Sequence, residues 1–358
     1  MQIIDNKTYT IQWIENVSKQ NRNVDKILVE KVIRALTLLV ELRKTELNFI
    51  FKGGTALMLM LQKPTRLSID IDIIVPQKTT EIEHFLDTIT QSGVFTKYSL
   101  QARYTESDIQ KAHYKFYYTP LIKTHSEEEY ILLDILFENN PYSQLTETDI
   151  VCPFIAINQT LTVQTPTIEN ILGDKLTAFA PNTTGIPYYK GKASMSMEIV
   201  KQLYDIGNLF DEARDVETIR NTFVANATIE LKYRNKQHLQ PTDVLDDMMQ
   251  TAFCLSSRGQ AGECNFEDLQ KGISRIKSYI FSTKYQIEDV IVSAAKAAYL
   301  AALLKTGSNT IERYISENQC INYSITSIPY NKLNKLKRNI TVAFFYWYKA
   351  LEMLGFAD

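Results

Sequence analysis

Two aspartates near the start of the chain have the type and spacing of metal ligands. Asp70 and Asp72 alternate with isoleucines in residues 68–73, and this alternation predicts a strand with its polar residues on one face. Side chains two residues apart on a strand lie roughly 6–7 Å apart, so the two carboxylates can share one metal ion or bridge two. Such hard oxygen ligands suit Mg²⁺ or Mn²⁺, with substrate phosphates completing the coordination. The alternative is an edge strand with a solvated polar face.

A glycine turn comes shortly before these aspartates. Gly53 and Gly54 follow a predicted strand, residues 47–51, and precede a predicted apolar helix, residues 55–61. Glycines let backbone N–H groups approach a phosphate closely, and a helix N-terminus favours negative charge. Gly53, Gly54 and Thr55 are therefore predicted to donate to substrate phosphates. A Gly-Gly pair alone is more often an ordinary tight turn, and only its place ahead of the aspartates favours phosphate binding.

These residues together resemble a known family. Lys-Gly-Gly-Thr-Ala-Leu at residues 52–57, followed by Arg-x-Ser-x-Asp-x-Asp at residues 66–72, is similar to the first motif of the AbiEii/AbiGii-type toxin nucleotidyltransferases. That family belongs to the DNA-polymerase-beta-like nucleotidyltransferase superfamily. Less sharp similarity continues in residues 169–178 and 201–206, so the resemblance covers roughly residues 45–210.

The resemblance implies an α+β fold with two domains. A polymerase-beta-like nucleotidyltransferase domain with N-terminal helices and a small mixed sheet is expected over residues 1–165. A mostly helical domain, residues 166–358, would complete the nucleotide site and bind the acceptor. The residue patterns agree with this division, because strand-type alternation gives way to helical periodicity near residue 165. The Gly- and Ser-containing residues 256–262 are the best candidate for an internal linker.

The same patterns predict individual elements. The first domain should contain helices at residues 25–46 and 80–92 and strands at residues 96–105, 111–119 and 128–137. Alternation in the second of these strands places His113, Lys115 and Tyr117 on one face and Tyr114, Phe116 and Tyr118 on the other. The second domain should contain helices beginning at Thr167 and covering residues 195–210, 211–232, 242–256, 265–280, 287–306 and 330–354.

A third carboxylate interrupts the apolar run of residues 130–137. Asp134 needs a partner if that strand is buried. In the superfamily that the chain resembles, a third acidic residue commonly lies on a strand beside the first two. Asp134 is therefore a candidate third metal ligand, or general base, with Asp70 and Asp72. The alternative is a structural aspartate that is capped or salt-bridged near a strand end.

The resemblance also assigns roles in the helical region. Lys175 would hold the β- and γ-phosphate oxygens as a point charge, and Asp205 would orient Lys175 or contact the base or ribose. The alternatives are a solvated lysine and a helix-surface or salt-bridged aspartate. The family often has an arginine ahead of residues 201–206. This chain has Lys190 and Lys192 there, which leaves that triphosphate contact open.

Two further residues lie between the glycines and the aspartates. Arg66 is a candidate for bidentate phosphate binding, or it caps the loop. Ser68 shares a strand face with Asp70 and could contact phosphate. Its hydroxyl could also be modified by a partner that silences the enzyme, or simply bond to the backbone.

The function implied by the resemblance is metal-dependent transfer of NMP from an NTP to an acceptor. The implied acceptor is RNA, with the tRNA 3′ end as a target, and the implied role is that of a toxin paired with a cognate antitoxin protein in phage defence. Two alternatives stay open. One is an enzyme that nucleotidylates a protein side chain, and the other is a non-catalytic nucleotide-binding module that acts through a partner.

Composition limits these options only loosely. The 358 residues are 45% hydrophobic and 22% charged, as in an ordinary globular protein. No membrane-spanning run or signal-peptide layout is present, so a cytoplasmic protein without a membrane partner is expected. The net charge of −2 neither favours nor excludes nucleic acid. The four cysteines are scattered and predicted to be reduced and buried, and the four histidines lack zinc-site spacing.

A basic and aromatic segment lies near the C-terminus. Residues 331–338 contain four basic side chains, and residues 344–348 are all aromatic. This pattern could grip RNA by phosphate contacts and stacking. An amphipathic terminal helix with its aromatics in the core is the favoured interpretation.

Overall fold

The computed structural model describes residues 3–61, 64–76, 82–101 and 111–357. The chain forms two compact units: Met1–Thr167 with Ser278–Lys284, and Ile168–Lys277 with Tyr285–Asp358. The first contains a mixed five-stranded sheet, and the second is mostly helical. The expected α+β class is confirmed. Thr80 and Glu81 of a predicted helix and residues 102–105 of a predicted strand lie outside the described residues.

The segment Ser278–Lys284 departs from the expected order of domains. Although it follows a helix of the second unit, it packs with the first unit. The backbone N–H of Leu67 donates to the carbonyl of Tyr279 at 2.7 Å, and Arg66 forms an isolated antiparallel bridge with Ile280. These backbone bonds explain why the helix predicted for residues 265–280 ends early, at Ile276.

The five-stranded sheet has the order β1-β2-β5-β4-β3. Its strands β2 and β5 are parallel, and every other neighbouring pair is antiparallel. In chain order the strands are β1 (Ile50–Lys52), β2 (Ile71–Val75), β3 (Lys97–Leu100), β4 (Lys111–Tyr118) and β5 (Glu129–Phe137). The parallel pair places the two acidic strands β2 and β5 side by side at the centre of the sheet.

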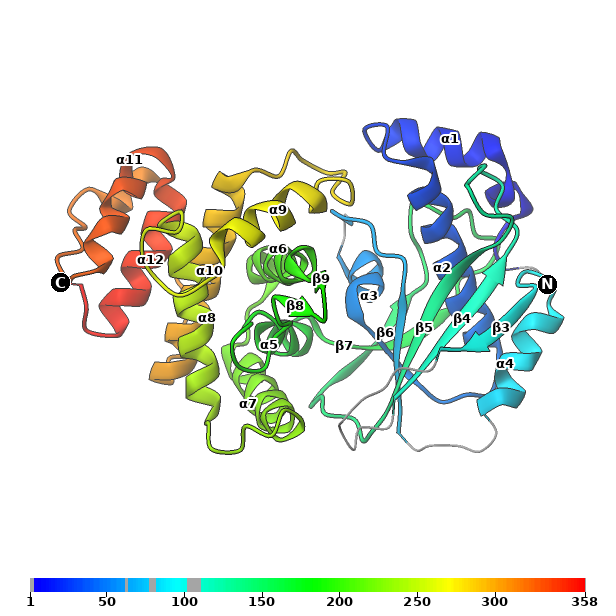
Figure 1. Ribbon diagram of the computed structural model, residues 1–358, viewed down its shortest axis with the longest axis horizontal. Helices are drawn as coiled ribbons and strands as arrows, with labels where there is room; N and C mark the ends of the chain where they lie inside the picture. The colour runs from blue at the N-terminus through cyan, green and yellow to red at the C-terminus, as the bar shows by residue number, and fades with distance from the viewer. Residues whose placement is uncertain (1–2, 62–63, 77–81, 102–110, 358) are drawn as a thin grey trace. The chain divides into compact units, whose positions relative to one another are not determined.

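The two faces of this sheet differ in chemistry. Helices α2 (Lys26–Lys44) and α4 (Ile82–Gln91) pack on one face (Figure 1). Tyr114, Phe116 and Tyr118 of β4 are buried in the core on that face, and the predicted division of β4 into two faces is confirmed. Burying one face this way leaves polar side chains on the other, as the period of two requires.

The strand β2 is shorter than predicted. It begins at Ile71, so Ser68 and Asp70 precede it instead of lying within it. The backbone of the residues just before β2 makes hydrogen bonds to other segments. The N–H of Leu67 donates to the carbonyl of Tyr279, and the Asp70 carbonyl accepts a hydrogen bond from the Thr55 hydroxyl. These contacts replace the strand ladder that alternation alone predicts.

Several elements of the first unit are not predicted from the sequence. They are the short helices η1 (Asn6–Tyr9) and α1 (Ile11–Gln20) and the hairpin of β6 (Leu145–Asp149) and β7 (Thr162–Pro166). The strand β6 has no fully buried residue. It therefore lacks the alternating apolar stripe by which strands are recognised in a sequence.

The second unit is built around an alanine-rich helix, α10 (Ile287–Thr306), which contacts α6, α8 and α12. Its alanines are completely buried, and small side chains let neighbouring helices approach closely. The unit's helices are α5 (Ile168–Ala178), α6 (Ser196–Glu212), α7 (Val216–Tyr233), α8 (Pro241–Ser256), α9 (Phe266–Ile276), α10, α11 (Leu336–Asn339) and α12 (Thr341–Met353). A small hairpin, β8 (Tyr189–Lys190) and β9 (Ala193–Ser194), and the 3-10 turns η2 (Glu317–Cys320) and η3 (Tyr330–Lys335) complete it.

Two predicted helices have different bounds for local reasons. The helix predicted for residues 211–232 begins at Val216, because the Asp215 side chain accepts from the backbone N–H groups of Glu217 and Thr218 and caps the helix there. The helix predicted for residues 330–354 is interrupted at Ile340, whose backbone is not helical (φ −142°, ψ 62°).

One prediction about the second unit is wrong. Residues 256–262, the candidate internal linker, connect α8 and α9 within that unit. The cysteines are not all reduced: Cys254 and Cys264 form a disulfide that closes this loop against α8. The loop after α8 turns back on the helix and brings together two cysteines that are ten residues apart in the sequence. Cys152 and Cys320 are free and buried, as predicted.

Candidate active site

Ionisable side chains form one row across four strands on the polar face of the sheet. Asp72 of β2 pairs in register with Asp134 of the parallel strand β5. Asp134 is also in register with His113 of β4, and Asp72 with Lys52 of β1. Residues in register on neighbouring strands project from the same face. We call Lys52, Asp72, Asp134 and His113 the carboxylate row.

The two carboxylates of this row are neighbours and are only partly buried. Cross-strand neighbours have Cβ atoms about 4.5–5.5 Å apart, and like charges so placed repel. Asp134 Oδ1 lies 2.6 Å from His113 Nδ1, and 30% of the Asp134 side chain is exposed. The structure thus places Asp134 beside Asp72, on the strand and face where the sequence predicts a third carboxylate.

The glycine turn packs directly against Asp72. Helix α3 (Gly53–Met60) begins at Gly53, whose φ of +81° lies in the left-handed region that favours glycine. A Cβ atom on Gly53 would overlap the Asp72 carboxylate oxygen Oδ2. The absence of a side chain at residue 53 therefore lets the carboxylate lie against the first turn of the helix.

The second glycine makes room for Arg66 and Ser68. A Cβ atom on Gly54 would lie 2.7 Å from both Arg66 Nη2 and Ser68 Oγ. Arg66 is only 7% exposed, and its Nη1 donates to the Leu67 carbonyl at 3.0 Å. The structure therefore brings Arg66 and Ser68 against the turn at Gly54. One nitrogen of the Arg66 guanidinium is already hydrogen-bonded to the backbone.

Thr55 and Asp70 make a contact with each other that the sequence does not predict. The Thr55 hydroxyl is buried and donates to the backbone carbonyl of Asp70 at 2.6 Å, so it fixes the loop instead of facing a ligand. Asp70 is partly buried and lies one residue before β2, so it is not part of the in-register row. The carboxylate that β2 itself contributes to the row is Asp72.

The donor set of the row fits a hard divalent cation. Among the residues that the structure describes, no group of three or more His, Cys, Asp and Glu side chains is arranged to hold a metal ion. Magnesium does not require such a group, because it is commonly bound by one or two carboxylates, with water and substrate phosphates as its other ligands. Asp72 and Asp134, adjacent and partly exposed, satisfy that requirement.

The second unit contains the other predicted pair. Lys175 of α5 and Asp205 of α6 form an ion pair with Nζ and Oδ2 2.9 Å apart, and Lys175 also donates to Gln202 at 2.9 Å. Their side chains are only 11% and 4% exposed. Asp205 is thus salt-bridged and in position to orient the Lys175 ammonium. Lys190 and Lys192, at the β8–β9 hairpin, are exposed.

Two residues of the carboxylate row have no role in the sequence-based interpretation. His113 contacts Asp134 directly, and Lys52 lies opposite Asp72. Alternation predicts the face on which His113 lies, but only strand register shows that this face meets the aspartates. Lys52 precedes the glycine turn, and nothing in its local sequence indicates its pairing with β2.

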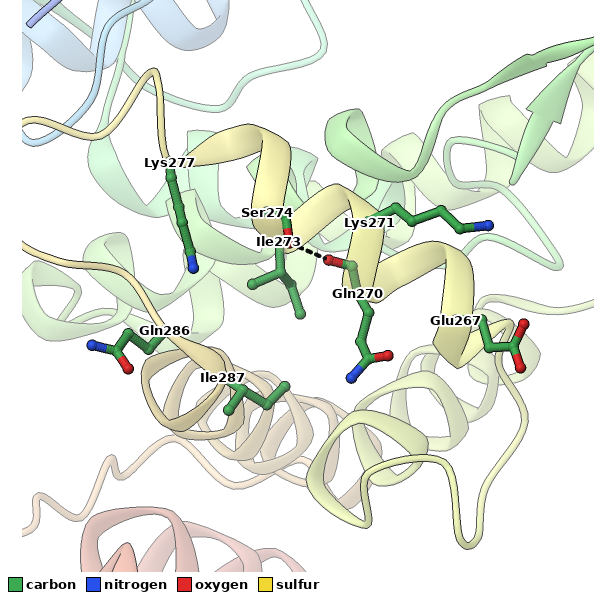
Figure 2. Close-up of a pocket in the computed structure, with 8 residues that line it drawn as sticks. All are labelled: Glu267, Gln270, Lys271, Ile273, Ser274, Lys277, Gln286 and Ile287. Carbon is green, nitrogen blue, oxygen red and sulfur yellow. Dashed lines mark hydrogen bonds between the residues drawn. The ribbon is translucent and has the colours of Figure 1, made fainter.

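A cavity of about 490 Å³ lies elsewhere, between α9 and the start of α10 in the second unit. Figure 2 shows side chains of both charges and of apolar type around it, including Glu267, Lys271, Lys277 and Ile287. None of the residues predicted from the sequence to bind metal, nucleotide or phosphate lines this cavity.

The aromatic residues near the C-terminus belong to the core. The side chains of residues 344–348 are all buried in α12, and Trp347 Nε1 donates to Ser256 Oγ at 2.9 Å. The favoured interpretation of this segment as a packed terminal helix is confirmed, and its aromatics are not available for base stacking.

Comparison with protein families shows the family of this chain. Residues 37–265 match the family described as the nucleotidyl transferase AbiEii toxin of type IV toxin–antitoxin systems. The chain belongs to this family. The match includes the glycine turn, the carboxylate row and the Lys175–Asp205 pair, and it confirms the family to which the sequence motifs point.

Solved structures of low identity are also similar. JHP933 from Helicobacter pylori has 16% identity and a TM-score of 0.40 over 81% of this chain and 94% of that chain. An antigenic nucleotidyltransferase-like protein from Paracoccidioides brasiliensis has 13% identity and a TM-score of 0.35 over 61% and 94%. No curated protein matches the sequence significantly. None of the helices in the described part of the chain is long and apolar enough to cross a membrane.

Proposed function

We propose that this family member transfers a nucleotide from an NTP to an RNA acceptor, using the carboxylate row as its metal-binding centre. The observation that carries the proposal is the registered pair Asp72 and Asp134 beside the first turn of α3. Two adjacent carboxylates repel each other unless a cation lies between them. The turn beside them offers backbone donors and a helix N-terminus to phosphate.

Each residue has a distinct task in this proposal. Asp72 and Asp134 would hold Mg²⁺, or Mn²⁺, which when bound neutralises charge on the triphosphate. The backbone N–H groups of Gly53 and Gly54 donate to phosphate oxygens. His113 orients the Asp134 carboxylate. Positioning and charge neutralisation provide most of the rate enhancement in such transfers.

The Lys175–Asp205 pair serves the triphosphate. The buried Asp205 carboxylate fixes the ammonium of Lys175, which holds the β- and γ-phosphate oxygens of the NTP as a point charge. Arg66 and Ser68 line the turn beside Gly54 and contact the phosphates from there. The acceptor hydroxyl attacks the α-phosphorus, and pyrophosphate leaves.

The biological role follows from the family. As a type IV toxin, the protein would act in the cytoplasm, where NTPs and RNA are present, and a separate antitoxin protein would oppose it in phage defence. The tRNA 3′ end is the acceptor that we favour, because it presents a free hydroxyl on a single-stranded segment.

Labelling with radioactive NTPs tests the proposal. The protein is incubated with each labelled NTP, Mg²⁺ and total RNA, and RNA and protein fractions are counted separately. We expect metal-dependent label in RNA with the wild type and none with Asp72→Asn. Label in protein alone would contradict the RNA acceptor. Metal-dependent label in neither fraction, with folded protein, would contradict an enzymatic function altogether.

A further inference from the structure

The polar face of the sheet continues beyond the carboxylate row, toward the C-terminal end of β4 and the N-terminal end of β5. Two residues beyond the row, Lys115 pairs with Leu132, and four residues beyond it, Tyr117 pairs with Tyr130. Four residues correspond to about 13 Å along a strand. Strand β3 extends the same face, because Ser99 pairs with Lys115 and Lys97 with Tyr117. We call this set, Lys97, Ser99, Lys115, Tyr117, Tyr130 and Leu132, the aromatic platform.

The two rings of the platform lie side by side, with lysines beside them. The centroids of Tyr117 and Tyr130 are 6.0 Å apart. The Lys115 ammonium lies 4.3 Å from the Tyr130 ring, and the Lys97 ammonium lies 5.1 Å from the Tyr117 ring. Such cation–π contacts hold the rings in place before any ligand binds.

The platform is accessible, in contrast to the opposite face. Tyr130 is 37% exposed and Tyr117 is partly buried, whereas Phe116 and Ile131 on the other face are completely buried. The Tyr117 hydroxyl lies 3.2 Å from Ser99 Oγ, which fixes the ring at its edge, while the Lys97 ammonium lies over the ring. The two accessible rings are therefore not part of the hydrophobic core, which lies on the opposite face of the sheet.

The charges on the platform are unequal. Lys97 is paired with Glu128 at 2.6 Å, so its charge is largely offset. Lys115 lies over the Tyr130 ring, and no carboxylate of the described residues forms an ion pair with it. A phosphate on the platform would therefore gain most from Lys115.

We propose that the aromatic platform binds the single-stranded end of the RNA acceptor and leads its terminal hydroxyl to Asp72 and Asp134. This inference rests on the proposed function for the reaction itself. Accessible rings stack on any base, and a lysine between the rings and the active centre matches the negative backbone. A protein acceptor would need an apolar contact area, and the platform offers only one aliphatic residue, Leu132.

Binding measurements without NTP test the platform independently of catalysis. A short fluorescent single-stranded RNA is titrated, at several salt concentrations, with wild type, Tyr117→Ala/Tyr130→Ala, and the ring-retaining control Tyr117→Phe/Tyr130→Phe. Stacking contributes about 1–3 kcal/mol per base, so we expect the alanine variant to bind roughly tenfold or more weakly. The phenylalanine variant should bind like the wild type, which also shows that the fold tolerates changes at these positions.

Salt dependence separates the contribution of Lys115. Removing one phosphate contact to a single strand lowers the slope of log K against log salt by about 0.7. We expect this change for Lys115→Ala and an unchanged slope for the tyrosine-to-alanine variant. Lys123→Ala removes an exposed lysine in the loop between β4 and β5 and serves as the matched control, with no expected change in slope.

The outcomes distinguish the platform from the proposed function. Equal RNA binding by wild type and Tyr117→Ala/Tyr130→Ala would overturn the platform even if nucleotide transfer to RNA is observed. The same would follow if the wild type does not bind single-stranded RNA, or if duplex RNA competes equally well. Loss of RNA binding in the alanine variant, with no transfer by the wild type, would support the platform and contradict the proposed reaction.

Discussion

Carboxylates in the two units of this protein lie in opposite environments. Asp72 and Asp134 lie side by side on a partly exposed sheet face. In the helical unit, Asp205 is ion-paired with Lys175, and the buried Asp247 accepts from the backbone and side chain of Asn182 and from the Thr183 hydroxyl. The helical carboxylates are satisfied by the protein itself. The sheet carboxylates are placed where like charges meet, which suits binding of an external cation.

This difference predicts that the two sets respond oppositely to mutation. Substituting a sheet carboxylate should remove activity with little effect on stability, since both carboxylates are partly exposed and a repulsion is relieved. Substituting a helical carboxylate should reduce stability, because its donors would be left buried and unsatisfied.

The largest expected effect is that of Asp72→Asn on activity. We expect nucleotide transfer to fall by about 10³-fold or more, because a group that stabilises charge in the transition state is lost. The melting temperature should change by no more than about 2 °C. Initial rates and calorimetric melting of the same preparation measure both. A variant that melts far below the wild type would show that Asp72 is structural.

The next effect is that of Asp205→Ala on stability. Removing one partner of a buried ion pair typically costs about 3–5 kcal/mol, so we expect a loss of that order in the free energy of unfolding. Urea denaturation gives the value. The double variant Lys175→Met/Asp205→Leu should recover part of the loss, since neither charge is then stranded. Unchanged stability in Asp205→Ala would show that the pair is not buried in solution.

A smaller effect is expected at the glycine turn. In Gly53→Ala the new methyl group would displace the Asp72 carboxylate, and a shift of about 1 Å near the reacting groups can cost about 10²-fold in rate. Gly93→Ala is the matched control, because Gly93 has a similar φ of +79° but no atom within 4 Å of its Cβ position. Both variants should lose similar stability, about 1–2 kcal/mol, and only Gly53→Ala should lose activity. Equal activity in the two variants would contradict the close packing on Asp72.

The smallest effect concerns pH and the N-cap of α7. Hydrogen bonds from the Thr218 side chain and backbone lower the pKa of Asp215 below its usual 3.8. A lowered pKa in the folded state adds stability above the unfolded pKa, and this stability is lost as pH falls through the folded value. Asp215→Ala should cost about 1 kcal/mol at pH 7, and the difference from wild type should shrink as pH falls below about 4. A difference independent of pH would show that the carboxylate charge does not contribute.

Local sequence accounts for much of the fold and for part of the site. Alternation predicts both faces of β4, and helical periodicity predicts α2 and α10 almost to their ends. The glycine turn and Asp72 are recognisable because their chemistry lies within one short segment. The contact of Asp134 with His113 and its pairing with Asp72 depend on the register between different strands, which no local pattern encodes.

Long-range contacts also explain the wrong predictions. Residues 278–284 bond to the loop before β2, which shortens both α9 and β2. The pairing of Cys254 with Cys264 requires the loop after α8 to turn back on that helix. In each case the local sequence is compatible with a regular element, and a distant backbone or side-chain partner determines where the element ends.

The central claim is that the sheet carboxylates, and not those of the helical unit, bind the metal–nucleotide complex. Calorimetric titration of each NTP with Mg²⁺ into wild type, Asp72→Asn and Asp215→Asn tests it most directly, since asparagine preserves the N-cap at residue 215. We predict that at least one NTP binds to the wild type and to Asp215→Asn with equal affinity, and at least tenfold more weakly to Asp72→Asn. Equal affinity in all three proteins would contradict the claim.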